Sequence, residues 1–208
     1  EQGVLKHEAS VGWVVTHPTT ALQIPTTVQG VLAARIDRLA AEEKDLLQQL
    51  AVIGRQFPVS LVKQVVPQSE AELYRVLSSL QTKEFLYEQP AFPEVEYIFK
   101  HALTQEVAYT SLLLEQRRVL HERIAQAIEQ QQLVQSGLSG LDEHASRLAH
   151  HYSRSGNTPK AVEYLTLAGQ QAVQRSANVE AIRHLQAALS LLPLLADTPE
   201  RARQELTL

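Results

Sequence analysis

A lysine and a histidine stand side by side where the chain changes from a strand-like to a helical pattern. In the run IFKHALTQEVAY (98–109), Lys100 and His101 follow an alternating apolar stretch and precede a helical one. A helix start leaves backbone N–H groups unpaired, so a cation there adds to their attraction for an anion. Imidazole titrates near neutral pH, and protonation would strengthen that contact. Capping or packing at the junction is the other interpretation of His101, and the sequence leaves both open.

Two other groups of basic side chains are weaker candidates. His144, His150 and His151 lie near two acids, but the i, i+4 histidine pair of helical zinc sites is missing, so we expect no metal. A second basic group alternates with acids on a predicted helix. This favours a solvated face with i, i+4 pairs over a contact to a partner or a phosphate. The group consists of Arg117, Arg118, His121 and Arg123, close to Glu115 and Glu122.

Motifs for nucleotide hydrolysis are absent from this sequence. None of the eight glycines is followed by lysine, which excludes a G-x-x-x-x-G-K-[ST] phosphate loop, and no G-x-G-x-x-G occurs. No serine–histidine–aspartate or paired-carboxylate arrangement stands out either. We therefore expect this chain by itself to have no catalytic activity.

The composition favours packed helices in a reducing compartment. Of the 208 residues, 44% are apolar and only 5% aromatic. The net charge of −4 provides no general basic surface for nucleic acid, and the absence of cysteine excludes disulfides. The apolar stretch at 189–196 is too short to span a membrane, and no signal segment is seen. Because the chain starts at Glu1 and contains no methionine, we expect a piece of a longer protein. The absence of cysteine agrees with a reducing compartment, and we expect that protein to be cytoplasmic.

The first half of the chain predicts a β-hairpin followed by a winged helix, a variant of the helix-turn-helix. Short apolar runs within 3–15 predict the hairpin. A helix over 24–40 follows, and its expected buried face is Val28, Val31, Leu32, Ile36 and Leu39. Three helices and two wing strands come next, over 41–54, 59–66, 69–84, 85–89 and 95–99. Ser69 and Glu72 are expected to form a capping box for the third of these helices.

The charges of the winged helix disfavour DNA binding. Its third helix, the usual reader of the major groove, has more acids than bases. Its wing contains three glutamates and no basic residue before Lys100, whereas affinity for DNA depends largely on cationic contacts to phosphate. A winged helix that serves as an internal module of its own protein, without binding DNA, is therefore the better interpretation.

The second half of the chain is helical in pattern. Residues 101–131 predict two helices or one kinked helix, and QSGLSG (135–140) is expected to break the chain. Three more helices follow, with two sets of residues at tetratricopeptide spacings. The sets are Leu148, Ala149, Tyr152, Ala161, Leu165 and Ala168, and then Gly169, Ala181, Leu185, Ala188 and Pro193. The expected fold is mainly α: a winged helix with a small β-hairpin wing, followed by a tetratricopeptide-like α-solenoid.

Five stretches that cover nearly all of the chain, in order, are specific enough to suggest a family. They are IPTTVQGVLAARIDRL, LLQQLAVIGRQFP, FLYEQPAFPEVEYIFKHALTQEVAY, RRVLHERIAQAIE and RLAHHYSRSGNTPKAVEYLTLAGQQA. Together they resemble one bacterial group, the signal-transduction ATPases with numerous domains (STAND). The resemblance is strongest to the ATPase-plus-repeat regions that occur with class III adenylate/guanylate cyclase domains.

This resemblance implies a domain order and a switch. Residues 1–24 would end the lid region of an ATPase, 25–112 would form the winged helix with its lead-in helix, and 113–208 would begin the repeats. The phosphate loop, with its ATP or ADP and Mg, would lie upstream, and a cyclase domain elsewhere. Bound ADP would hold the winged helix on the nucleotide core, and ATP exchange with an inducer at the repeats would release it. His101 matches a family histidine that touches the nucleotide phosphates, and Lys100 lies beside it.

The expected function is that of a non-catalytic regulatory segment, which couples the nucleotide state of an upstream ATPase core to the repeats. The expected partners are that core and an unknown protein or inducer at the repeats, with no membrane partner. One alternative is an interaction scaffold in which the winged helix is only a spacer. The other, with less support, is a DNA-binding regulator.

Overall fold

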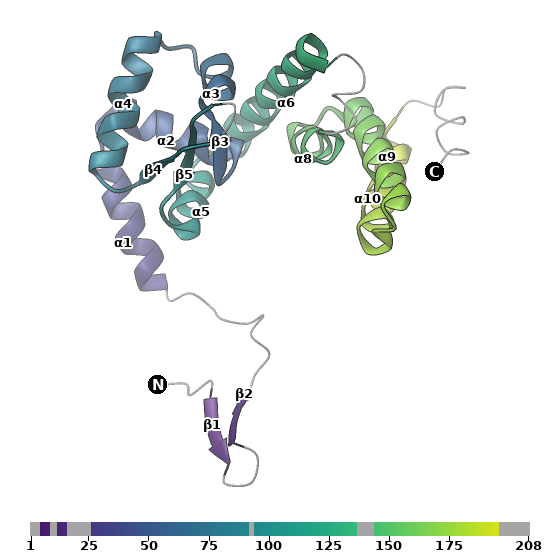
Figure 1. Cartoon of the computed structure of the whole chain (residues 1–208), viewed down its shortest axis with the longest axis horizontal. Coiled ribbons are helices and arrows are strands. Elements are labelled where there is room, and N and C mark those ends of the chain that lie inside the picture. The colour runs from purple at the N-terminus through teal and green to yellow at the C-terminus, as the bar shows by residue number, and fades with distance from the viewer. Residues whose placement is uncertain (1–4, 9–11, 16–25, 92–93, 137–143, 196–208) are drawn as a thin grey trace.

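Helices make up most of the chain in the computed structural model, which describes residues 5–8, 12–15, 26–91, 94–136 and 144–195 (Figure 1). The helices are α1 (Thr26–Asp37), α2 (Ala41–Ile53), α3 (Val59–Val65), α4 (Glu70–Thr82), α5 (Ala102–Thr110), α6 (Leu114–Ser136), α8 (Ala145–Ser155), α9 (Thr158–Gln174), α10 (Asn178–Leu191) and the 3-10 helix η2 (Leu192–Leu194). The strands are β1 (Leu5–Glu8), β2 (Gly12–Val15), β3 (Gln56–Pro58), β4 (Leu86–Gln89) and β5 (Glu96–Phe99). The expectation of a mainly α chain is confirmed.

The first two strands form an antiparallel hairpin. β1 pairs with β2 in a register that sets Leu5 opposite Val15 and Glu8 opposite Gly12. The hairpin predicted within 3–15 is therefore confirmed. Its assignment to the end of an ATPase lid stays a prediction.

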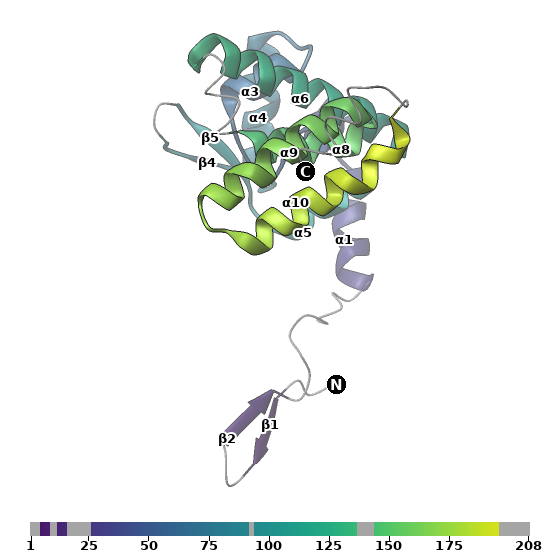
Figure 2. The same cartoon turned by 90° about the vertical axis from the view of Figure 1, so that its right-hand side faces the viewer.

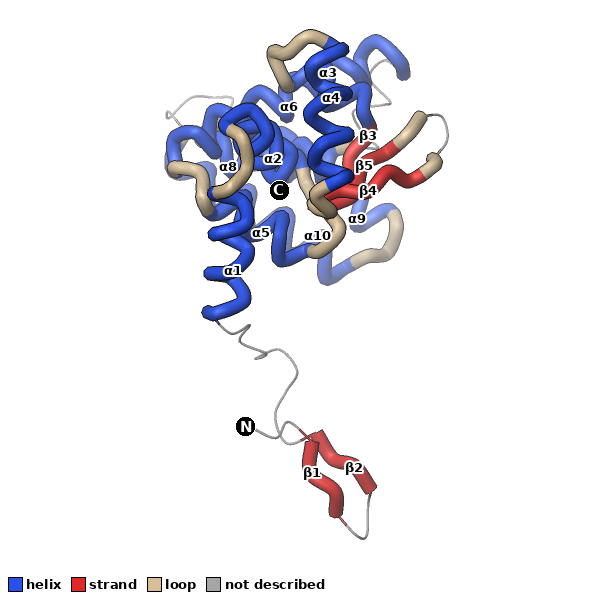
Figure 3. Tube along the Cα trace, turned by 90° about the vertical axis from the view of Figure 1, so that its left-hand side faces the viewer, coloured by secondary structure: helices blue, strands red, loops and turns tan. Residues whose placement is uncertain are grey.

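A three-stranded antiparallel sheet lies beside α4 and has the order β3-β5-β4 (Figure 3). β4 and β5 are the two predicted wing strands, whereas β3 falls where the sequence pattern indicates only a break. The ring of Phe57 is buried and meets Phe99 of β5 edge-on, with 6.1 Å between centroids. Pro58 has no N–H to continue the ladder, so the strand ends there and α3 begins.

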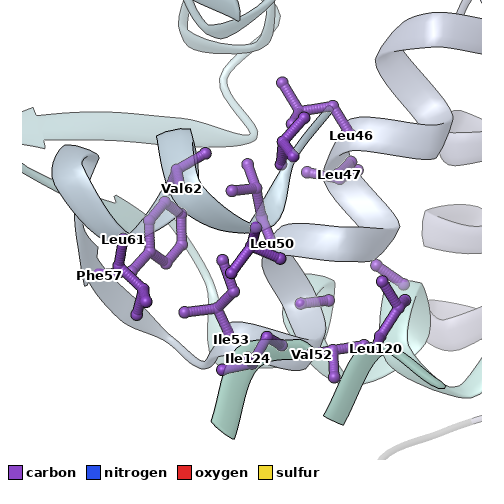
Figure 4. Packing of buried hydrophobic residues seen from close by; sticks show 14 of the residues in the cluster. Leu46, Leu47, Leu50, Val52, Ile53, Phe57, Leu61, Val62, Leu120 and Ile124 are labelled. Atoms are coloured by element: carbon purple, nitrogen blue, oxygen red, sulfur yellow. The ribbon is translucent and has the colours of Figure 1, made fainter. Parts of the chain in front are cut away.

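A cluster of buried apolar side chains fills the space between α2, α3, the sheet and α6 (Figure 4). Along α2, Leu46, Leu50 and Ile53 follow the 3–4 spacing of one helix face, and all are buried. Leu120 and Ile124 of α6 reach the same cluster. Full burial of one such side chain contributes about 1.5–3 kcal/mol, so these contacts bind α6 to the first half of the chain.

The helix α1 buries only part of its predicted face. Leu32 and Ile36 are 9% and 1% exposed, whereas Val28 and Val31 are 44% and 62% exposed. The prediction is wrong for the two valines because the beginning of α1 extends beyond the helices that cover its end (Figure 1). Helical spacing alone does not show where a helix leaves its neighbours.

Two predicted helix starts have side-chain support. The Ser69 hydroxyl accepts the Glu72 N–H at 3.3 Å, which confirms Ser69 as the N-cap of α4. The predicted capping box is confirmed only in part, because the Glu72 carboxylate accepts the Ser69 hydroxyl, at 3.0 Å, in place of the Ser69 N–H. At the start of α2, the Glu43 carboxylate accepts the Ala40 N–H at 3.0 Å. Lys83 also donates to Glu43, at 2.6 Å, and so links the end of α4 to the start of α2.

The segment after His101 is two helices rather than one kinked helix, since α5 ends at Thr110 and α6 begins at Leu114. α6 packs against α2 and α3 on one side and against α8 on the other. The buried apolar cluster continues across the boundary expected between 112 and 113. α6 therefore belongs to the packing of both predicted domains.

The helices α8, α9 and α10 pack each on the next in chain order (Figure 2). All six residues of the first tetratricopeptide set are buried. In the second set, Ala181 and Ala188 are buried, Leu185 is partly buried and Pro193 is exposed. A Cβ on Gly169 would lie 2.5 Å from Leu185 Cδ2, so glycine allows α9 and α10 to approach closely. No helix among the described residues is both long and apolar enough to cross a membrane.

The carboxylate of Glu129 joins α6 to two of the stacked helices, α8 and α9. Glu129 accepts hydrogen bonds from the hydroxyls of Tyr152 at 2.7 Å and Tyr164 at 2.6 Å, and from Lys160 Nζ at 2.8 Å. The two tyrosine rings are stacked, with 5.5 Å between centroids. Burial by itself raises the pKa of Glu129, but the three donors outweigh burial, and the pKa lies below its usual range. Glu129 is therefore held ionised inside the stack.

Candidate anion-contact site

Lys100 and His101 lie in the short connection from β5 to α5. The backbone N–H of Phe99 donates to Arg55 O at 2.9 Å, and that of Lys100 donates to Phe85 O at 3.0 Å. His101 is the N-cap residue of α5, and its carbonyl accepts the N–H of Thr104 at 3.0 Å. The connection is thus held by its backbone, which leaves both side chains on the surface.

The side chain of His101 is exposed and makes no capping hydrogen bond. The interpretation that it caps the helix or packs at the junction is therefore wrong. Its backbone, with φ −133° and ψ 134°, is extended, as is usual for an N-cap residue. His101 directly precedes the first turn of α5, where the first backbone N–H groups have no partner within the helix.

Lys100 is paired with an acid from the turn that follows α4. Its Nζ lies 2.9 Å from Glu84 Oε1, and the two side chains are 40% and 69% exposed. The hydrogen bond from Lys100 is the main reason that the pKa of Glu84 is lowered, and the charges of Arg35 and His101 act in the same direction. An ion pair this exposed contributes little to stability, so Lys100 can exchange Glu84 for another anion at little energetic expense.

Arg35 of α1 completes the site, and sequence reasoning did not assign it there. Its guanidinium donates to Lys83 O at 3.2 Å and lies over the Phe85 ring, 5.0 Å from the centroid. The sequence indicates Arg35 only as a polar interruption of the apolar face of α1. No spacing rule connects it with the turn after α4, which lies far along the chain.

These residues suit the binding of an oxyanion. Of its three cationic or protonatable side chains, Arg35 comes from α1, whereas Lys100 and His101 come from the connection between β5 and α5; all three lower the pKa of Glu84. Guanidinium and ammonium groups form charge-assisted hydrogen bonds with carboxylate and phosphate oxygens. The carboxylate at this site, Glu84, is paired with Lys100, so a metal accompanying a phosphate needs ligands from another region.

The three histidines at 144, 150 and 151 lie in different surroundings. His151 is buried and lies against His121 of α6, with 2.9 Å between their Nδ1 atoms, while His150 is exposed. His144 is the N-cap residue of α8. Within the described ranges, no three His, Cys, Asp or Glu side chains converge as a metal ion requires. The nearby acids at 142 and 143 lie outside the described residues.

The basic group on α6 is only partly a solvated face. Arg118 pairs with Glu115 at 3.0 Å on the surface, although at i, i+3 spacing instead of the predicted i, i+4. His121, however, is 1% exposed, and its Nε2 lies 3.1 Å from the Tyr109 hydroxyl. Arg117 lies over the Tyr109 ring. The prediction is wrong for His121 because α8 and the end of α5 cover that side of the helix.

Burial sets the charge of the two facing histidines. It lowers the pKa of His121 to about 3 and that of His151 to about 2, and nearby Arg154 and His150 contribute in the same direction. Both rings are therefore neutral at pH 7. One Nδ1 must then donate to the other, so one ring is the Nδ1–H tautomer and the other is the Nε2–H tautomer.

Comparison with known proteins identifies one relative of unassigned function. The chain is 28% identical over 171 residues to an uncharacterized protein, R02095, of Rhizobium meliloti (strain 1021). The matched region is 82% of this chain but only 16% of the relative. No protein-family model matches the chain, and no solved structure matches it.

Proposed function

We propose that this chain is a regulatory, non-catalytic segment of a STAND-type ATPase, and that it couples the nucleotide state of an upstream core to a helical repeat scaffold. The observation that carries the proposal is the grouping of His101, Lys100 and Arg35 on one exposed edge. The five STAND-like stretches give this edge its proposed ligand, a nucleotide phosphate. The relative's much greater length is in keeping with a segment that works inside a large protein.

The proposed winged helix is supported by the order of the elements. From α2 to β5 the chain runs helix, strand, helix, helix, strand, strand, and its first strand pairs with its last. The proposed solenoid is supported by α8, α9 and α10, which pack in chain order with small residues at their contacts. Both names describe architecture, and the function depends on the site.

In this proposal the phosphates of ADP bind at the connection between β5 and α5. His101 and Lys100 would hold the winged helix against the upstream core that carries ADP or ATP with Mg. Exchange to ATP together with an inducer at the repeats would favour the released arrangement, because the two nucleotides make different contacts in the two states. α6 would transmit the change, since it packs against both halves of the chain.

The charges of the third helix of the proposed winged helix support a role inside a protein. Arg75 of α4 pairs with Glu42 at 2.6 Å, and Lys83 just after α4 pairs with Glu43 at 2.6 Å. Basic side chains that form ion pairs with acids of the same chain attract the phosphate backbone of DNA less strongly. Duplex DNA is therefore not among the ligands that we propose.

An interaction scaffold without nucleotide coupling is the second candidate. A groove of about 440 Å³ between α8 and α10 favours it. His150 and Arg154 line one wall of the groove, and Arg183, His184 and Glu180 line the other. Grooves between stacked helices suit extended partners, and this one would be available with or without a nucleotide.

The test uses the full-length protein that contains this chain, with a fluorescent ADP analogue. His101→Ala should speed ADP release by about tenfold, which corresponds to the loss of one charge-assisted hydrogen bond. Lys100→Ala should act in the same direction. Lys44→Ala is the matched control, since Lys44 is a lysine of the same region that pairs with a single carboxylate, Asp37, at 2.6 Å.

If both site variants release ADP at the wild-type rate, the proposed phosphate contact is wrong. The scaffold candidate makes a separate prediction. Partner binding at the repeats would then be equal in the ADP-bound and ATP-bound protein, and it would fall on substitution of Arg154 and Arg183.

A further inference from the structure

Glu84 has an unusual backbone for its residue type. Its φ of 62° lies in the left-handed region, which glycine adopts far more readily than glutamate. It follows α4 at the position where many helices have glycine, and the next N–H, of Phe85, donates to Leu80 O at 2.9 Å. The backbone therefore favours glycine here, so the glutamate points to a role for its carboxylate.

That carboxylate lies among the cations of the anion-contact site. Lys100 donates to it at 2.9 Å. Arg35 contacts the residues on both sides of Glu84, through Lys83 O at 3.2 Å and the Phe85 ring at 5.0 Å. The lowered pKa of Glu84, due first to Lys100 and then to Arg35 and His101, agrees with this arrangement.

We infer that Glu84 is a built-in competitor for the phosphate: its carboxylate holds the anion position formed by Arg35, Lys100 and His101, and turns away when a phosphate binds. The nature of the ligand, a nucleotide phosphate, rests on the proposed function. Carboxylate and phosphate oxygens accept the same charge-assisted hydrogen bonds. Because Glu84 is 69% exposed and Lys100 is 40% exposed, the exchange needs only rotation of surface side chains.

This competitor has a functional consequence. In the released arrangement Glu84 neutralises Lys100, so the open winged helix attracts free anions less strongly. In the closed arrangement the nucleotide must displace Glu84, which weakens the closed state and makes release easier. Glu84 therefore shifts the equilibrium between the closed and the released arrangements, and it is not one of the contacts that hold the closed arrangement together.

The experiment measures binding of inorganic pyrophosphate to the 208-residue chain by NMR titration at low salt. Glu84→Gln keeps the side-chain shape but removes the competing charge, and it should bind pyrophosphate about fivefold more tightly than the wild type. Glu70→Gln is the matched control, since Glu70 is an exposed acid of α4 that pairs with a different lysine, Lys63. Adding Arg35→Ala to Glu84→Gln should abolish the gain.

A Glu84→Gln chain that binds pyrophosphate no better than the Glu70→Gln chain would overturn the inference. This failure is distinct from that of the proposed function. If Glu84→Gln gains affinity while His101→Ala leaves ADP release unchanged in the full-length protein, the competitor is real but the nucleotide coupling is wrong. If His101→Ala speeds ADP release and Glu84→Gln gains nothing, the coupling stands without a competitor. Adenosine, which lacks phosphate, should bind neither chain.

Discussion

Acidification from pH 7 to pH 5 should strongly destabilise this chain, because His121 and His151 are buried as a neutral pair between α6 and α8. Their side chains belong to residues only 1% and 3% exposed. Burial, helped by nearby positive or protonatable groups, lowers their pKa values to about 3 and about 2. In the unfolded chain a histidine has a pKa of about 6.5. Unfolding at pH 5 therefore takes up two protons that unfolding at pH 8 does not.

The magnitude follows from the linkage between proton binding and folding. A histidine whose pKa is lowered by folding contributes its full stability above pH 6.5 and loses it progressively as the pH falls toward the folded value. Each histidine changes the free energy of unfolding by about 1.4 kcal/mol per pH unit within that window. Between pH 7 and pH 5 this amounts to about 2 kcal/mol for one histidine and about 4 kcal/mol for the pair. A loss of that size is a large part of the stability of a typical domain.

The assay is urea unfolding followed by circular dichroism at pH 7, 6 and 5. This range stays above the pH at which the hydrogen-bonded carboxylates Glu43 and Glu129 begin to lose their stabilising charge. His151→Gln should lose about 2 kcal/mol of the wild-type pH dependence between pH 7 and pH 5. His101→Gln, which removes an exposed histidine outside this pair, is the matched control. If His151→Gln and the control keep the same pH dependence as the wild type, the neutral buried pair is refuted.

Two further predictions concern the stacked helices. Gly169→Ala should destabilise the chain by about 1 kcal/mol, because overpacking against Leu185 outweighs the higher helix propensity of alanine; in a Leu185→Ala background the same change should instead stabilise by about 1 kcal/mol. A double-mutant cycle in urea measures the sign, and destabilisation in both backgrounds would argue against this close approach. Glu129→Gln should destabilise by about 2 kcal/mol at pH 7, because the tyrosine and lysine donors lose a charged acceptor. Glu163→Gln, on the exposed face of α9, is its control and should change thermal stability little; equal effects of the two would contradict the Glu129 contact network.

The sequence was most informative where a pattern is local. Apolar spacing predicts α2, α3 and α4 and the buried positions of α8 and α9, and Ser69 predicts the start of α4. The tetratricopeptide spacing also identifies Gly169, because a small residue at that position matters only when two helices touch. These features depend on neighbours within a few turns, so the sequence contains most of what determines them.

The prediction missed features that depend on distant parts of the chain. β3 is only three residues long, and Gln56–Pro58 becomes a strand because β5 supplies its partner. Val28 and Val31 fit a buried face, yet they are 44% and 62% exposed. His121 fits a solvated basic group until α8 covers it.

The candidate site was likewise predictable from the sequence only in part. By itself the sequence determined that Lys100 and His101 stand at the change from strand to helix, since both patterns are local. Only the tertiary structure decided that both side chains are exposed, that Arg35 joins them and that Glu84 lies among them. Those contacts join α1, the end of α4 and the start of α5, and their energies depend on distances through space that residue spacing does not contain.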